Sequence, residues 1–247
     1  MKICLDSYDG SLETPEDAWL NLIQRIEQVS CNLHIFPELA TSGYQWEKLA
    51  LFARLAKGFV NHLLPVAKKH KKVIVIGTFW KSNTKKFYNR LLWVDGIQNK
   101  IDFYDKMHLI DAFQEKEYLQ AGQSPKQVFF QNIPIGLSIC YDLRFPELFR
   151  KYVSKSPAEI LLCIARWPKE RIEHWKALAL ARAIENQTFF VGVNANHSSL
   201  VVNPKGEILC IQKKPNEQII QEISLQEVPK WRNAFPVLSD IRKDLCK

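Results

Sequence analysis

The chain contains 247 residues, of which 47% are hydrophobic and 24% are charged. This composition is typical of a globular domain and excludes a disordered or low-complexity chain, because such chains bury too little apolar surface to fold. The net charge of +8 admits a nucleic-acid partner only where lysines and aromatic residues gather on one face. The segment Lys85–Tyr88 is a weak hint of this, and the run Lys68–Lys72 fits a solvated helix end, so we expect no nucleic acid.

The sequence carries no sign of a membrane span or a secretion signal. No stretch approaches the ~18 consecutive apolar residues of a spanning helix. Asp6 and Asp9 fall where a signal peptide needs its apolar core, so we expect no such signal. The six cysteines form no C-x-x-C pair and no dense ladder, which favours reduced thiols and a cytoplasmic protein.

The first half of the chain alternates predicted strands and amphipathic helices. Thr14, Pro15 and Glu16 predict a helix start, with a side-chain cap, a fixed first φ angle and an acid in the first turn. Apolar residues then recur at helical spacing between Trp19 and Val29 and between Leu49 and Ala67, which predicts two helices with buried faces. The strands predicted here are Lys2–Leu5, Leu33–Phe36, Val73–Ile76 and a hairpin of Leu91–Val94 with Lys100–Tyr104 around Asp95-Gly96.

The second half contains more strands and one long helix. The helix is predicted over Ile172–Asn186, with Trp175, Leu178, Ala179 and Ile184 on its apolar side. The predicted strands are Gln127–Phe130, Ile133–Ile139, Glu159–Ile164, Thr188–Val193, Leu200–Val202 and Glu207–Gln212. Strands separated by helices, followed by hairpins, indicate a mixed α/β layered domain, in which sites gather at the carboxyl ends of strands.

Three reactive side chains follow predicted strands: Glu38, Lys106 and Cys140. A deprotonated thiol is a good nucleophile, a carboxylate can take its proton, and an ammonium can stabilise an oxyanion. Together they suit acyl transfer through a thioester. We expect burial to raise the pKa of Glu38, with Lys106 opposing that rise. Singly, each has a structural alternative: a helix-start acid, an exposed loop lysine and a buried cysteine.

The sequences around these residues are more specific than their spacing. The segments Phe36–Tyr44, Tyr104–Leu109 and Cys140–Glu147 resemble the three signatures of the carbon–nitrogen hydrolase (nitrilase) superfamily, in the same order. The resemblance covers nearly the whole chain and continues through Arg166-Trp167-Pro168, His174-Trp175, Ala181–Asn186 and Ser199–Gly206. The strings CYDLRFPE and ARAIENQ are similar to the ω-amidase branch, of the 2-oxoglutaramate amidase type.

This resemblance implies an α/β fold, a four-layer α-β-β-α sandwich, and we expect residues 1–247 to form a single domain. It implies a small-molecule amide substrate, with ammonia released from a small ω-amide carboxylate such as 2-oxoglutaramate. We expect no cofactor, no metal, no membrane partner and a homodimer.

The resemblance also implies the roles of individual residues. Glu38, Lys106 and Cys140 map onto a catalytic triad, and the oxyanion would be held by Lys106 and the backbone N–H of Tyr141. Members of the family carry a second glutamate shortly after the lysine. Glu115 best fits that position, and Glu117 is the alternative.

An ω-amide carboxylate needs a cation or several N–H donors opposite the amide. The candidates are Arg144, Arg166 and Lys169. The planar fork of Arg166 suits a carboxylate, with an exposed loop position as the alternative. For Arg144 we favour a structural ion pair with Asp142 or Glu147 over substrate contact.

Three further residues are candidates for the substrate pocket. The proline after Trp167 favours an extended backbone there, which would aim the indole into the pocket as a wall. Tyr44 ends the first signature, and His174 with Trp175 forms either a pocket wall or part of the core. His108 is expected to be hydrogen-bonded within a turn rather than paired with the cysteine.

Other readings stay open. The loop after Asn196 is shorter than in many members of the superfamily, which affects the expected substrate scope and dimer contact. The protein could instead be another amidase of the superfamily, acting on N-carbamoyl or aliphatic amides. More distant alternatives are a basic nucleic-acid-binding protein and an inactive protein on the same fold.

Overall fold

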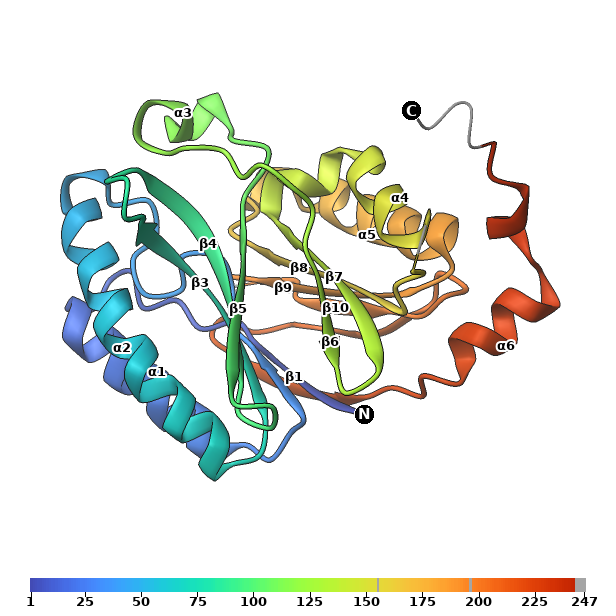
Figure 1. Ribbon diagram of the computed structural model, residues 1–247, viewed down its shortest axis with the longest axis horizontal. Coiled ribbons are helices and arrows are strands. Elements are labelled where there is room, and N and C mark those ends of the chain that lie inside the picture. Colours follow the sequence, from blue (N-terminus) through green and yellow to red (C-terminus); the bar gives the residue numbers. More distant parts are fainter. Residues whose placement is uncertain (155, 196, 243–247) are drawn as a thin grey trace.

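The fold is a sandwich of two β-sheets with helices on both outer faces (Figure 1). The computed structural model describes residues 1–154, 156–195 and 197–242. Helices α1 and α2 cover one sheet, and α4 and α5 cover the other (Figure 1). The predicted four-layer α-β-β-α architecture is therefore confirmed. Asn196, which begins the loop noted above, and Cys246, one of the six cysteines, lie outside the described residues.

Each sheet contains six strands and mixes parallel with antiparallel neighbours. The first sheet has the order β12 (Gln218–Glu222), β1 (Lys2–Asp6), β2 (Leu33–Ile35), β3 (Val73–Lys81), β4 (Phe87–Asp95), β5 (Lys100–Asp105). The second has the order β11 (Ile208–Ile211), β10 (Leu200–Val202), β9 (Phe189–Asn194), β8 (Ile160–Ala165), β7 (Ile133–Ile139), β6 (Gln127–Phe130).

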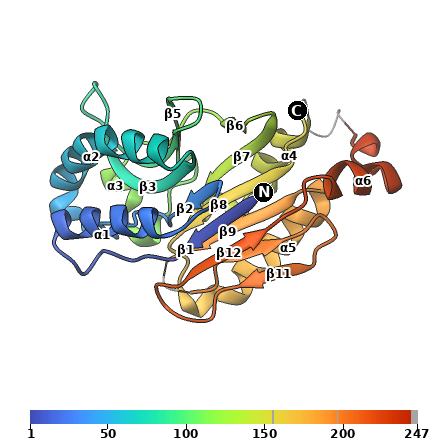
Figure 2. The same cartoon turned by 90° about the horizontal axis from the view of Figure 1, so that it is seen from below.

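The α-helices lie outside these sheets. They are α1 (Pro15–Gln28), α2 (Leu49–Lys69), α3 (Glu115–Tyr118), α4 (Pro146–Ser154), α5 (Ile172–Asn186) and α6 (Glu227–Ala234). Short 3₁₀ turns are η1 (Trp46–Lys48), η2 (Asp111–Phe113), η3 (Cys140–Arg144), η4 (Lys169–Arg171) and η5 (Val237–Asp240). Helix α6 lies beyond the end of the sandwich (Figure 2). Within the described ranges, no helix has the length and apolar character needed to cross a membrane.

The alternation of strand side chains divides the core into layers. On β3, Val73 and Val75 pack between the two sheets, whereas Ile74 and Ile76 pack against the helices. Trp19 of α1 joins that helix-side cluster and stacks on Phe59 of α2 at 4.8 Å between ring centroids. The near-continuous apolar strands seen in the sequence are explained by this burial on both faces.

The predicted start of α1 is confirmed, because Thr14 Oγ1 accepts a hydrogen bond from the backbone N–H of Asp17 at 3.2 Å, with Pro15 following at the first helical position. Two other expectations were wrong. Ile184, predicted on the apolar side of α5, is 52% exposed, while Arg182 is only 4% exposed. Lys72, predicted on a solvated face, is buried and caps α1 by donating to the carbonyl of Ile26 at 2.8 Å.

The sequence also missed several elements. Strand β4 begins at Phe87 rather than Leu91. Its first four residues were missed because two aromatic residues followed by two polar ones show no period-two pattern. Helices α3, α4 and α6 and strand β12 were not predicted, because they are short or carry little apolar periodicity. Of these, α3 and the preceding loop matter most, because they border the functional cavity.

Candidate active site

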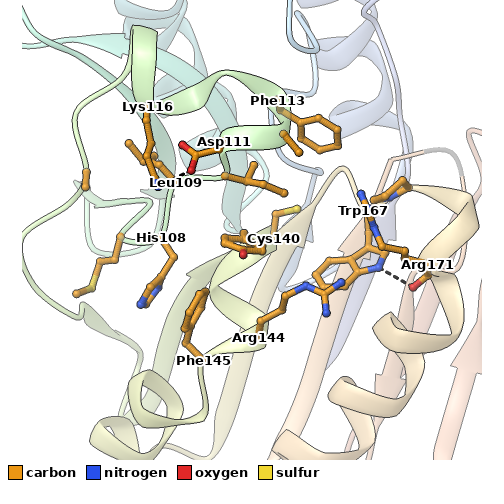
Figure 3. A pocket seen from close by; sticks show the side chains of 16 residues that line it. His108, Leu109, Asp111, Phe113, Lys116, Cys140, Arg144, Phe145, Trp167 and Arg171 are labelled. Atoms are coloured by element: carbon orange, nitrogen blue, oxygen red, sulfur yellow. Dashed lines mark hydrogen bonds and ion pairs between the residues drawn. The ribbon is translucent and has the colours of Figure 1, made fainter.

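A cavity of about 700 Å³ lies at the carboxyl ends of β5, β7 and β8. Its walls come from the segment after β5, from η3 and from the turn after β8 (Figure 3). Cys140, Arg144, Phe145 and Trp167 lie around this space, with Phe113 on the opposite loop (Figure 3). The predicted site at the strand ends therefore coincides with a cavity large enough for a small organic substrate.

Cys140 is held at a sharp turn between β7 and η3. Its φ is +47°, a left-handed backbone conformation that is unusual for residues other than glycine and is often found at functional positions. The carboxylate of Asp142 fixes this turn, because Oδ2 accepts from the backbone N–H of Ile139 at 2.9 Å and from the Tyr104 hydroxyl at 2.7 Å. The thiol is thus presented to the cavity from a rigid element.

Glu38 reaches the site because its backbone lies directly against β3. A side chain on Gly77 would place Cβ 2.6 Å from the Cα of Glu38, so only glycine allows this approach. The Gly77 N–H donates to Pro37 O at 3.1 Å, and the Ala40 N–H donates to Gly77 O at 3.1 Å. The segment after β2 is therefore locked to its neighbour strand.

Lys106 lies between two buried carboxylates. Its Nζ donates to Glu38 Oε1 at 2.8 Å and to Glu115 Oε1 at 2.8 Å, and all three side chains are fully buried. Glu115 is held in turn by the backbone N–H of Ile110, which donates to Oε2 at 2.9 Å. Glu117 is exposed on α3. Of the two glutamates left open by the sequence, Glu115 is the one brought to the lysine.

Two further polar side chains join this cluster. The Tyr44 hydroxyl donates to Glu38 Oε1 at 3.0 Å and to Glu115 Oε1 at 3.2 Å. Asn89 Nδ2 donates to the same two oxygens at 2.7 and 3.2 Å. Tyr44 was expected in the substrate pocket and instead lies in this network. Asn89 was missed, and its one sequence signal is an asparagine within a largely apolar strand.

The pKa values of Glu38 and Cys140 are shifted in opposite directions. Burial raises the pKa of Glu38, but the Lys106 ammonium and the Arg166 backbone N–H outweigh it, so the pKa lies below its ordinary value. Both opposing effects expected from the sequence are present, and the lowering effects together are the larger. Burial and the Glu38 carboxylate raise the pKa of the Cys140 thiol well above its usual range, although Lys106 opposes this. At neutral pH the pair is therefore a thiol beside an ionised carboxylate. Burial lowers the pKa of Lys106, but the charges of Glu38 and Glu115 outweigh burial and raise it above its ordinary value.

The oxyanion donors proposed from the sequence lie close to the thiol. Tyr141 is the second residue of η3, and the first turn of a helix leaves its N–H groups without intrahelical acceptors. Tyr141 also lines the cavity beside Cys140. Tyr141 thus borders the cavity, whereas the Lys106 ammonium is fully buried between Glu38 and Glu115 and is not among the residues that line the cavity.

Arg144 does not form the expected ion pair with Asp142 or Glu147. Its guanidinium lies beside the indole of Trp167 (Figure 3), 4.7 Å from the ring centroid. Its Nη2 lies 3.5 Å from His174 Nδ1. The Asp142 carboxylate is instead occupied by Tyr104, by the Ile139 N–H and by His108. Arg144 is therefore a cation in the cavity wall.

The indole of Trp167 forms part of the cavity wall, as expected, and its Nε1 donates to the carbonyl of Arg171 at 2.7 Å. Trp175 belongs to the core, where it packs against Trp167 with ring centroids 5.7 Å apart. His174 is exposed on α5 and supports Arg144 from outside the wall. Sequence analysis left open whether His174 and Trp175 form a pocket wall or part of the core, and Trp175 is part of the core.

His108 is hydrogen-bonded, as expected, rather than paired with Cys140. Its backbone N–H and its Nδ1 lie 3.0 and 2.7 Å from Asp142 Oδ1. Its ring stacks on Phe145 with centroids 3.8 Å apart, and both residues line the cavity. Across residues 1–154, 156–195 and 197–242, no cluster of histidine, cysteine and carboxylate side chains could hold a metal ion.

The other two candidate cations point elsewhere. The Arg166 guanidinium forms an ion pair with Asp9, and its backbone N–H donates to Glu38 Oε2 at 2.8 Å. Its fork is thus occupied, contrary to the expectation that it faces the substrate. Lys169 is exposed on η4, and the residue of that turn that lines the cavity is Arg171.

The amino-acid sequence is similar to those of known proteins. The sequence model of the family described as Carbon-nitrogen hydrolase matches residues 5–233. The 2-oxoglutaramate amidase of Bacillus subtilis (strain 168) is 35% identical over 229 residues, which cover 89% of this chain and 88% of the relative. Omega-amidase YafV of Escherichia coli (strain K12) is 31% identical over 217 residues, which cover 83% of this chain and 82% of the relative.

A solved structure agrees with the fold over nearly the full length. XC1258 from Xanthomonas campestris, a CN-hydrolase superfamily protein with an arsenic adduct in its active site, matches with a TM-score of 0.91 at 25% identity. The match covers 98% of this chain and 97% of that one. The chain therefore belongs to the carbon-nitrogen hydrolase family and is an amidase of the nitrilase superfamily.

Proposed function

We propose that the protein is an ω-amidase, which releases ammonia from a small amide that carries a carboxylate at its other end, such as 2-oxoglutaramate. The observation that carries the proposal is a thiol beside an ionised carboxylate and an ammonium, at one end of a cavity with Arg144 in its wall. The 2-oxoglutaramate amidase of Bacillus subtilis is similar to this chain over most of its length, which supports the same substrate class.

In the first half of the reaction, Glu38 takes the proton of the Cys140 thiol as sulfur attacks the amide carbonyl. The carbonyl oxygen becomes an oxyanion, which Lys106 and the Tyr141 N–H stabilise. Collapse of this intermediate breaks the C–N bond. The leaving nitrogen takes the proton from Glu38, so ammonia departs and a thioester remains on Cys140.

In the second half, water replaces ammonia beside Glu38. The carboxylate removes a proton from water as its oxygen attacks the thioester carbonyl, and the same two donors hold the second oxyanion. Collapse expels the Cys140 sulfur, which recovers the proton from Glu38. The depressed pKa of Glu38 suits this role, because the carboxylate is ionised and ready to accept at neutral pH.

The substrate carboxylate is assigned to the cationic side of the cavity. Arg144 and Arg171 both line it, and the stacking of Arg144 on Trp167 restricts the guanidinium to a narrow range of positions. A restrained planar fork binds a carboxylate with two parallel hydrogen bonds and little loss of side-chain freedom. This assignment replaces Arg166, whose guanidinium is paired with Asp9.

Two matched amides test the substrate class. Succinamate and butyramide differ chiefly in the terminal carboxylate, so an ω-amidase hydrolyses succinamate and 2-oxoglutaramate far better. Arg144→Met should raise KM for the acids by about 10–150-fold, the equivalent of one charged hydrogen bond of about 1.5–3 kcal/mol. Equal rates on succinamate and butyramide would leave an aliphatic amidase and reject the ω-amidase assignment.

The covalent step is tested separately. Acid quenching during turnover, followed by intact-mass analysis and peptide mapping, should detect an acyl adduct on Cys140. Cys140→Ala should lose both the adduct and turnover. Full turnover in Cys140→Ala would reject the thioester mechanism. Cys210, which lies outside the cavity, provides the matched control, and Cys210→Ala should keep both signals.

A further inference from the structure

Asp9 is connected to Glu38 through a single intervening residue. Its carboxylate forms a two-point ion pair with the Arg166 guanidinium, in which Nη2 meets Oδ1 and Nη1 meets Oδ2 at 3.1 Å. The backbone N–H of Arg166 donates to Glu38 Oε2 at 2.8 Å. Lys106 bonds to the other oxygen, Oε1, so these two contacts together set the rotation of the Glu38 carboxylate.

The loop that carries Asp9 is itself anchored. Asp9 accepts from the Ser11 N–H at 3.0 Å, and its own N–H donates to Asn216 Oδ1 at 2.9 Å. The Gly10 N–H donates to Ala40 O at 2.8 Å, which ties the loop to the segment that follows Glu38. The carboxylate is therefore a fixed point rather than a mobile surface group.

The arginine is fixed from both ends. Its side chain is mostly buried, at 14% exposure against 10% for Asp9, and Nη2 also approaches Leu39 O at 3.4 Å. The next residue is anchored as well, because the Trp167 N–H donates to Asn194 Oδ1 at 2.7 Å. The peptide before Arg166 is held at its carbonyl as well, because the Ala195 N–H donates to Ala165 O at 3.0 Å. The Asp9 ion pair and these backbone contacts together oppose rotation of this peptide.

We propose that Asp9 is a positioning residue for the amidase reaction, and that it acts by holding Arg166 so that the Arg166 N–H orients Oε2 of Glu38. The inference rests on the role of Glu38 as the base proposed above. Asp9 is not among the residues that line the cavity. Its effect is on the geometry of proton transfer, where a displacement of about 1 Å can cost ~10²-fold in rate.

The central test compares Asp9→Ala with wild type on two substrates, 2-oxoglutaramate and the best neutral amide. We expect kcat to fall about 10–100-fold on both, with KM changed less than about threefold. Asp9→Asn, which keeps the acceptor for the Ser11 N–H but loses the charge, should fall less. Asp9→Glu should recover part of the rate. The matched control is Asp102→Asn, a paired carboxylate on β5 outside the cavity, which should keep wild-type kcat.

A double-mutant cycle tests the route through Arg166. If Asp9 acts through the arginine, Asp9→Ala combined with Arg166→Met should lose no more kcat than the worse single variant. If the loss of kcat in the double variant equals the product of the losses in the two single variants, the proposed route through Arg166 is wrong. Melting temperatures show whether each variant is folded, and Asp9→Asn supplies the measurement if Asp9→Ala does not fold.

The outcomes separate this inference from the proposed function. Wild-type kcat in both Asp9→Ala and Asp9→Asn, while Glu38→Gln is inactive, overturns the inference alone. A rise in KM for 2-oxoglutaramate without a fall in kcat also overturns it, because the ion pair would then serve the substrate carboxylate. Full activity in Glu38→Gln instead overturns the proposed mechanism.

Discussion

The first sheet holds two buried ionic clusters that differ in how their charges balance. Beside β1, the single carboxylate of Asp6 meets two basic partners, Arg25 at 2.7 Å and His34 at 3.0 Å. At the carboxyl ends of β2 and β5, the single ammonium of Lys106 meets two carboxylates, Glu38 and Glu115, each at 2.8 Å. The carboxylates of both clusters are buried, and both clusters have a thiol nearby, since Cys4 Sγ lies 3.7 Å from His34 Nε2. The second cluster lies beside Cys140, whose thiol lines the cavity of about 700 Å³.

The difference shows which feature of a buried cluster carries chemistry. Around Asp6, burial raises the carboxyl pKa, but His34 and Arg25 outweigh it and keep the acid fully satisfied as an ion. Around Lys106, two carboxylates share one cation, so one of them remains available to accept a proton from the neighbouring thiol. Burial and ion pairing are common to both clusters, and the excess carboxylate is what makes the second a candidate base.

The largest effect is expected at the base itself. Glu38→Gln and Lys106→Met should each fold normally and lose at least about 10²–10³ in kcat, because the first removes the proton acceptor and the second an oxyanion donor. Steady-state kinetics and circular dichroism on the same preparations measure both properties. Near wild-type turnover in Glu38→Gln would contradict the acid–base assignment.

A smaller loss is expected at the second carboxylate. Glu115→Gln should lower kcat about 10–100-fold, because Lys106 loses one of the two charges that position its ammonium. Glu117→Gln, two residues away and exposed, is the matched control and should be active. If the two variants have equal activity, the second glutamate has no positioning role.

The balanced cluster should show the opposite pattern, a loss of stability with little loss of chemistry. Asp6→Ala should lower the free energy of unfolding by about 3 kcal/mol, near the low end for breaking a buried pair, since Arg25 is 22% exposed and can be solvated. Urea unfolding measures the stability, and kcat per folded molecule should be unchanged. A large fall in kcat without unfolding would erase the distinction between the clusters.

The smallest effect concerns the pH dependence of stability. Burial lowers the pKa of His34, but Asp6 outweighs it and raises the pKa above the ordinary 6.5. The protonated form is therefore favoured in the folded state, so this contribution is complete below pH 6.5 and is lost as the pH rises through the raised value. In urea unfolding, wild type should lose more stability than His34→Gln as the pH rises above 6.5. Parallel curves would contradict this.

The sequence by itself determined most of the strands and the three residues at their ends. Period-two and period-3.6 patterns report burial directly, which is why α1, α2, β6 and β7 were predicted close to their observed bounds. Strand β3 was predicted only over Val73–Ile76, although it continues to Lys81. Glu38, Lys106 and Cys140 were identifiable because each follows a strand and lies in a specific signature. Only the separation of these residues along the chain was visible, not their contacts.

The tertiary structure decided which side chains face the chemistry. The partner of Arg166 is Asp9, 157 positions away along the chain, and no local pattern predicts a contact at that distance. Asn89 and Tyr44 join the ionic cluster for the same reason, since a polar residue in a strand or loop gives no sign of its partner. Packing also reversed the expectation for Arg144, which stacks on Trp167 and remains in the cavity wall. Chain periodicity fixes which residues are buried, whereas the charge balance of a buried site depends on contacts that only the folded sheets create.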